Sequence, residues 1–215
     1  MLKQFLSIGF AFLSFALSAQ IDSIRIAQQL KEEGGYSKLI ERFTNSDSTL
    51  TIEDFKLIYY GYQLSPSYYS KENEFKENLI KPLNRSGQYN QVLELADSIL
   101  LVNPVSVVAH FEKAFACARL GKTDLEAYHQ KRYILLCNVI KTSGNGSALL
   151  RFNCNTTNDA LDFIACKGFS PINDRKTDTG LIEFDLAKNK QKLLHMYFYI
   201  PTKAYTAPNS TPDSE

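Results

Sequence analysis

The sequence predicts an α+β protein in which tetratricopeptide-like helical hairpins are followed by a small mixed α/β sheet domain. Two observations support this prediction. Gly87-Gln88-Tyr89 is followed by Gly121 at an interval of 34 residues, which is the tetratricopeptide period. After the Ser-Gly-Asn-Gly-Ser cluster at residues 143–147, the apolar pattern changes from a helical period to alternation. We therefore divide the chain into a helical-repeat domain (residues 20–143) and an α/β domain (residues 147–203).

The repeat begins where a glycine ends one helix and a tyrosine fills the bend. Val92, Ala96 and Ile99 then follow Tyr89 at a spacing that lets two helices approach, and Pro104 is placed to open the next helix. Gly34-Gly35-Tyr36 begins the same pattern, so an earlier, degenerate repeat is expected.

The first nineteen residues resemble a secretory signal peptide. Lys3 supplies a positive start, and Phe5–Leu17 is apolar but too short to cross a bilayer. Small residues then predict cleavage after Ser18 or Ala19. The alternative is a membrane anchor helix. We expect an exported protein, periplasmic or extracellular, with no integral membrane segment after cleavage.

Helical periodicity and end signals define the expected helices of the first domain. They cover Ser23–Glu33, a segment after Tyr36, a segment opened by Thr51, and then Glu72–Asn84, Tyr89–Val102, Pro104–Leu120 and Asp124–Thr142. Thr51 and Thr123 are expected to cap the helices that follow them.

The helix over Glu72–Asn84 carries two further expectations. Phe75, Leu79 and Leu83 lie on one stripe, which we expect to face inward. Pro82 is expected to kink or restart the helix.

In the second domain we expect a strand over Ala148–Cys154, a helix over Thr157–Lys167 and a hairpin of two strands. The hairpin strands are Leu181–Leu186 and Leu193–Ile200. A turn centred on Asn189 would place Phe184 opposite Leu194, Ile182 opposite Met196, and Glu183 opposite His195. Residues 204–215 have the composition of a disordered tail.

A cluster of tyrosines provides the candidate binding residues. Tyrosine combines a large apolar face with a hydroxyl and is common on recognition surfaces. The alternative is that these rings pack inside the protein. The candidates are Tyr59, Tyr60, Tyr62, Tyr68 and Tyr69.

Export would permit disulfides. Cys117 and Cys137 lie too far apart along an expected helical hairpin to pair, whereas Cys154 and Cys166 flank a short helix and could do so. Otherwise all four are expected to be buried thiols.

No catalytic, metal or cofactor site is predicted. His110 and His129 are expected about 9 Å apart along adjacent helices and without a third ligand. His195 could pair with Glu183, or act with Cys154 or Cys166 as nucleophile, but no motif supports catalysis. The net charge of +1 and the lack of a basic block argue against a nucleic-acid partner.

Three segments resemble an uncharacterised, domain-of-unknown-function family of exported Gram-negative (Bacteroidetes-type) proteins. They are residues 50–62, which include Tyr59-Tyr60-Gly61-Tyr62, the 143–147 cluster, and Met196-Tyr197-Phe198-Tyr199-Ile200. The resemblance covers about residues 22–201. It implies export and the fold, and no activity.

The leading hypothesis is therefore a non-enzymatic protein-binding or scaffold module that uses the helical-repeat surface to hold a protein or peptide. The alternative is an envelope or polysaccharide-related enzyme, or a glycan-binding protein, with its site on the C-terminal sheet. A third possibility is a structural subunit whose sheet edge pairs with a partner strand.

Overall fold

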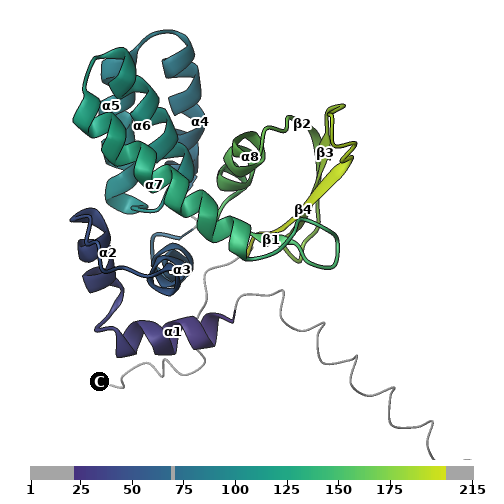
Figure 1. The fold of residues 1–215 in the computed structure, drawn as a ribbon, viewed down its shortest axis with the longest axis horizontal. Helices are drawn as coiled ribbons and strands as arrows, with labels where there is room; N and C mark the ends of the chain where they lie inside the picture. The colour runs from purple at the N-terminus through teal and green to yellow at the C-terminus, as the bar shows by residue number, and fades with distance from the viewer. Residues whose placement is uncertain (1–21, 69–70, 202–215) are drawn as a thin grey trace, which may run out of the picture.

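The computed structural model describes residues 22–68 and 71–201. Within these residues the chain forms eight α-helices and one four-stranded sheet, which confirms the α+β class. Figure 1 shows the helices grouped on one side and the sheet, with α8 beside it, on the other. The predicted signal peptide (residues 1–19), Tyr69 and the predicted tail (residues 204–215) lie outside the described residues.

Most predicted helices form close to their expected bounds. The helices are α1 (Ser23–Glu32), α2 (Tyr36–Thr44), α3 (Ile52–Gly61), α4 (Lys71–Arg85), α5 (Tyr89–Val102), α6 (Val107–Arg119), α7 (Thr123–Thr142) and α8 (Thr157–Cys166). A 3₁₀ turn over Tyr62–Leu64 extends α3.

The caps differ from one helix to the next. Thr51 forms the expected capping box, in which its hydroxyl accepts from the Asp54 N–H and the Asp54 side chain accepts from the Thr51 backbone. The predicted cap at Thr123 is wrong, because α7 begins at Thr123 itself without a side-chain cap. Helix α6 begins later than expected because Ser106 caps it through the Ala109 N–H.

Helix α4 turns a different face inward from the one expected. Phe75 and Leu79 are exposed, with 63% and 40% of their surface accessible, and Ile80 is fully buried. The prediction of an inward Phe75–Leu79–Leu83 stripe is therefore wrong for its first two members. Pro82 does not restart the helix, since α4 continues unbroken to Arg85.

The glycines of the repeat pattern do end helices. Gly87 and Gly121 have φ of 75° and 69°, which a residue with a side chain rarely adopts. Each turn reverses the chain, so α4 packs on α5 and α6 packs on α7. Val92, Ala96 and Ile99 are fully buried between these helices, as their spacing predicted.

The sheet has the strand order β1-β4-β3-β2. Its strands are β1 (Phe152–Asn153), β2 (Pro171–Lys176), β3 (Leu181–Leu186) and β4 (His195–Tyr199). The first strand is much shorter than the predicted Ala148–Cys154. The edge strand β2 was not predicted, because its exposed residues lack an apolar alternation.

The register of the β3–β4 hairpin differs by two residues from the prediction. Phe184 pairs with Met196 and Ile182 pairs with Phe198, because the hairpin is centred on Lys190, one residue after Asn189. The two-residue difference preserves the faces, since side chains alternate with a period of two. Ile182, Phe184, Met196 and Phe198 are therefore still buried.

One hydrophobic core joins the two parts of the chain. It includes Tyr59 and Leu136 from the helices, Phe163 from α8, and Ile182 and Phe198 from the sheet. A second, smaller core lies between α4, α5 and α6. In the part of the chain that the structure describes, no helix is both long and apolar enough to span a bilayer.

Candidate functional site

The helical part meets the C-terminal part at a buried junction that is built around Tyr59. The Tyr59 hydroxyl donates to Asp159 Oδ2 at 2.8 Å and accepts from the Asn155 N–H at 3.1 Å. The Asn155 amide in turn donates to the Tyr59 carbonyl at 2.6 Å. The other Asp159 oxygen accepts from the Val107 N–H at 3.1 Å, so this carboxyl connects α8 to the first turn of α6.

The other candidate tyrosines that the structure describes are also buried. The Tyr60 hydroxyl donates to the Asn153 carbonyl at 3.3 Å, and the Tyr68 hydroxyl donates to the Asn155 carbonyl at 2.8 Å. No more than 5% of the surface of Tyr59, Tyr60, Tyr62 or Tyr68 is accessible. These four rings therefore do not form the exposed contact surface that we expected. The hydroxyls of Tyr59, Tyr60 and Tyr68 donate to backbone and carboxyl acceptors of the C-terminal part, whereas the Tyr62 hydroxyl donates to the Ser67 carbonyl.

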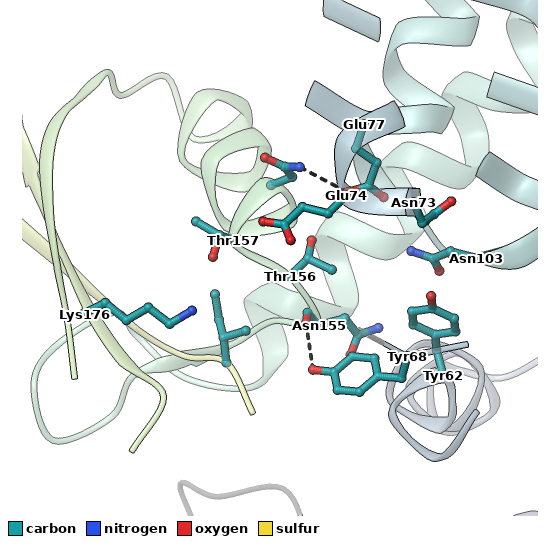
Figure 2. Close-up of a pocket in the computed structure, with 12 residues that line it drawn as sticks. Tyr62, Tyr68, Asn73, Glu74, Glu77, Asn103, Asn155, Thr156, Thr157 and Lys176 are labelled. Carbon is teal, nitrogen blue, oxygen red and sulfur yellow. Dashed lines mark hydrogen bonds between the residues drawn. The ribbon is translucent and has the colours of Figure 1, made fainter. Parts of the chain in front are cut away.

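A pocket of about 130 Å³ opens beside this junction, and we call it the junction pocket (Figure 2). It receives side chains from α4, from the segment around α8, and from the sheet. Its lining is Tyr62, Tyr68, Asn73, Glu74, Glu77, Asn103, Asn155, Thr156, Thr157, Asn158, Lys176 and Ile200. These side chains are mostly amides and hydroxyls, so the pocket is suited to hydrogen bonding. Among the residues that the structure describes, none of the lining side chains is His, Cys or Ser.

Glu77 is the buried carboxyl of the junction pocket, with only 3% of its surface accessible. It accepts from the Ser106 hydroxyl at 2.7 Å and from the Asn158 amide at 3.1 Å. Burial raises the pKa of Glu77, and nearby carboxylates raise it further. Burial likewise raises the pKa of Asp159, to which the Glu77 charge contributes. Burial therefore disfavours the charged form of both carboxyls.

Asn103 provides a hydrogen-bond donor that the protein leaves unused. Its side chain oxygen accepts from the Val105 N–H at 3.3 Å, which fixes the orientation of the amide. Its Nδ2 is buried and has no hydrogen-bond partner among the described residues. Figure 2 shows this nitrogen directed toward the interior of the junction pocket. A buried unpaired donor costs about 1–3 kcal/mol, so an acceptor placed there by a ligand would be favoured.

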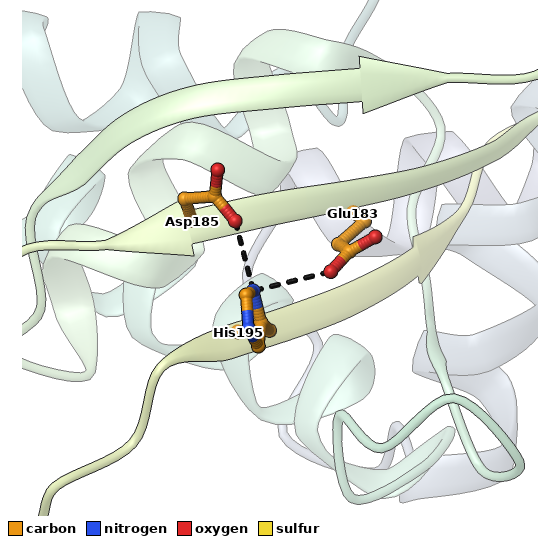
Figure 3. A group of neighbouring side chains, drawn as sticks. All are labelled: Glu183, Asp185 and His195. Carbon is orange, nitrogen blue, oxygen red and sulfur yellow. Dashed lines mark hydrogen bonds and ion pairs between the residues drawn. The ribbon is translucent and has the colours of Figure 1, made fainter.

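The outer face of the sheet gathers a second group of ionisable side chains (Figure 3). His195 Nδ1 lies 2.8 Å from Asp185 Oδ1 and 3.1 Å from Glu183 Oε1. The predicted contact between His195 and Glu183 is therefore present. It is a diagonal contact, because Asp185 is the residue directly opposite His195.

Arg175 occupies the same outer face. Its guanidinium donates to both oxygens of Asp185, at 2.9 and 2.8 Å, and also contacts Glu183 Oε1 at 2.9 Å. These hydrogen bonds from Arg175 lower the pKa values of both Asp185 and Glu183. The possible ligand atoms of Glu183, Asp185 and His195 lie close enough together to bind a cation. Arg175, however, already neutralises the two carboxylates. The geometry is that of an exposed ion-pair network.

The two helical histidines touch each other, so the predicted separation of about 9 Å is wrong. His110 Nδ1 lies 2.9 Å from His129 Nδ1, and His110 Nε2 lies 3.1 Å from the Pro104 carbonyl. The prediction counted only the rise along the helices and ignored the reach of the imidazoles. Because the carbonyl can only accept, His110 is protonated on Nε2 and accepts from His129. Burial lowers the pKa of each histidine to about 3.

The cysteines are four unpaired thiols. Cys117, Cys137 and Cys154 are buried as expected, and Cys166 is exposed at the end of α8. The structure contains no Cys154–Cys166 bond, and Cys154 is fully buried beside Tyr59.

Sequence reasoning missed most of the junction pocket. Asn73, Glu77, Ile80 and Asn84 lie on the inward face of α4. Three of these four residues are polar, so the apolar stripe beginning at Phe75 dominated the pattern. The available signal was the helical spacing of Asn73, Glu77 and Asn84, but nothing local shows that polar groups of other segments meet them.

The fold and the pocket together define an α+β protein with a hydrogen-bonding cavity between its helical part and its sheet. The chain belongs to the family described as Domain of unknown function (DUF4919), which it matches over residues 24–205. No curated protein and no solved structure matches the chain.

Proposed function

We propose that this chain is an exported, non-enzymatic binding protein that holds a polar segment of a protein or peptide partner in the junction pocket. In this proposal the hairpins α4–α5 and α6–α7 are tetratricopeptide-like and present the partner to the pocket, and the protein acts in the periplasm or outside the cell. The observation that carries the proposal is the unused Asn103 Nδ2 donor in a pocket lined by both parts of the chain.

The chemistry of the pocket supports a peptide ligand. Asn103 offers a donor, and the buried Glu77 carboxyl and the Asn155 and Asn158 amides offer further polar groups. A peptide bond carries one donor and one acceptor, so it complements such a lining. Binding would recover the cost of the unpaired donor, and this recovery would favour the bound state.

Glu77, the buried carboxyl of the lining, is held by hydrogen bonds from Ser106 and Asn158, which supports a structural role in binding over a nucleophilic one. His195 and Glu183, the residues on which the enzyme hypothesis relied, belong to the exposed outer face with Arg175. A glycan is the second candidate ligand. The amide and hydroxyl side chains of the junction pocket would also bind sugar hydroxyls. This lining favours the junction pocket over the outer face of the sheet as a glycan site.

The test is capture from a native envelope fraction with the immobilised protein and two matched variants. Asn103→Asp keeps the oxygen that accepts from Val105 but replaces the free donor with an acceptor. Asn173→Asp makes the same chemical change on the exposed edge strand β2. We expect a polypeptide that is retained by the wild type and by Asn173→Asp, and lost by Asn103→Asp.

Thermal unfolding of each variant separates loss of binding from loss of folding. Equal retention by all three proteins would contradict the junction pocket as the site. If the retained material is glycan in place of polypeptide, the second candidate replaces the first.

A further inference from the structure

Two thiols that lie far apart in the sequence meet on the surface between α7 and α8. Burial is the larger cause of the raised pKa of the Cys137 thiol and of the Tyr133 hydroxyl, and the Cys166 thiol lies near enough to both groups to raise the pKa of each further. Cys137 has 4% of its surface accessible, whereas Cys166 is exposed. One member of the pair is thus open to solvent and the other lies directly beneath it.

The packing of the two helices independently supports this proximity. The Tyr133 hydroxyl donates to the Asp162 carbonyl at 3.5 Å. Tyr133 precedes Cys137 by one helical turn, and Asp162 precedes Cys166 by one turn. Each cysteine therefore lies one helical turn beyond this contact between α7 and α8. Cα atoms of α7 and α8 approach within 8 Å, so the two helices are in contact.

We propose that Cys137 and Cys166 are a redox pair that forms a disulfide between α7 and α8 when the protein reaches an oxidising compartment. The pairing differs from both pairs considered from the sequence, because neither Cys117 nor Cys154 is involved. It does not depend on the ligand of the junction pocket, but it does use the expectation of export.

The oxidant is a disulfide-bearing thiol-exchange partner, such as oxidised glutathione or an exported oxidoreductase. The exposed Cys166 thiolate attacks one sulfur of that disulfide and forms a mixed disulfide, and the other sulfur leaves as a thiolate. The Cys137 thiolate then attacks the Cys166 sulfur, forms the new bond and releases the second thiol. Two electrons and two protons pass to the oxidant, which is reduced to two thiols, and the protein gains one disulfide.

The order of these steps follows from burial. Burial raises the pKa of Cys137, so its thiolate is scarce and it is poorly placed to meet a large oxidant. The bond would fix the C-terminal end of α8, whose opposite end supplies Thr157 and Asn158 to the junction pocket. Oxidation would therefore also restrain one wall of that pocket.

The test equilibrates the purified protein with oxidised or reduced glutathione, blocks the remaining thiols with N-ethylmaleimide, and maps the peptides by mass spectrometry. We expect a linked peptide pair containing Cys137 and Cys166. The thermal midpoint should be about 5–10 °C higher in the oxidised protein than in the reduced protein. Cys166→Ser should abolish the linkage and the shift, and its exposed position should leave folding intact.

Cys154→Ala is the matched control, and it should retain the linkage. Three results would overturn the proposal: Cys166 alkylated in the folded protein under oxidising conditions, Cys166 carrying only glutathione, or Cys166 linked to Cys154.

Discussion

The junction and the outer face of the sheet each combine carboxyls with a tyrosine, but in opposite surroundings. At the junction, Asp159 is fully buried and accepts from Tyr59, and burial raises its pKa. On the outer face, Asp185 is partly exposed and bonded to Arg175, which lowers its pKa. Similar side chains therefore act as a buried framework in one region and as a solvated ion-pair network in the other, because solvent access decides the cost of charge.

The largest expected difference in stability between the two regions comes from removing a whole tyrosine ring. Tyr60→Ala should lower the free energy of unfolding by about 3–5 kcal/mol, because it leaves a cavity beside α3 and removes a junction hydrogen bond. Tyr197→Ala, on the outer face, should lower it much less, because solvent fills the space. Chemical denaturation of both variants measures this difference. Equal losses would show that the outer face is as tightly packed as the junction.

An intermediate effect is expected when only the hydroxyl is removed. Tyr59→Phe leaves Asp159 Oδ2 and the Asn155 N–H without that partner inside the core, which should cost about 1–3 kcal/mol. Tyr197→Phe removes the 3.0 Å hydrogen bond to Glu183, but water can replace it. Thermal unfolding of the two variants compares them. A neutral Tyr59→Phe would mean that this hydrogen bond does not hold the junction together.

The smallest expected effect is a change in the pH dependence of stability. Because the folded pKa of Asp159 is raised, its contribution is fully present below the unfolded pKa of about 4 and is lost as pH rises through the folded value. The folded pKa of Asp185 is lowered, so its contribution is present above about pH 4 and is lost as pH falls through the folded value.

Asp159→Asn should therefore gain stability relative to the wild type as pH rises above about 4. Asp185→Asn should lose stability relative to the wild type as pH rises toward about 4, and the difference should stay constant above that value. Denaturant midpoints measured at a series of pH values test both slopes. Parallel curves for the two variants would contradict the assignment of opposite pKa shifts to the two regions.

Local signals of the sequence determined much of the secondary structure. Gly87 and Gly121 end helices because a positive φ suits glycine, and Thr51 caps α3 because its hydroxyl and Asp54 are three residues apart. The spacing of Val92, Ala96 and Ile99 correctly identified a helix–helix contact. Such signals involve residues within a few turns of one another, so the sequence alone contains them.

Only the tertiary structure decided which side chains are buried and which distant segments of the chain meet. Tyr60 and Phe75 are both aromatic, yet the C-terminal part covers Tyr60 and leaves Phe75 exposed. The junction pocket brings Glu77 beside Asn158, and the α7–α8 contact brings Cys137 beside Cys166. These contacts join segments far apart in the chain. No local periodicity encodes them, because burial depends on which other segment packs against a helix face.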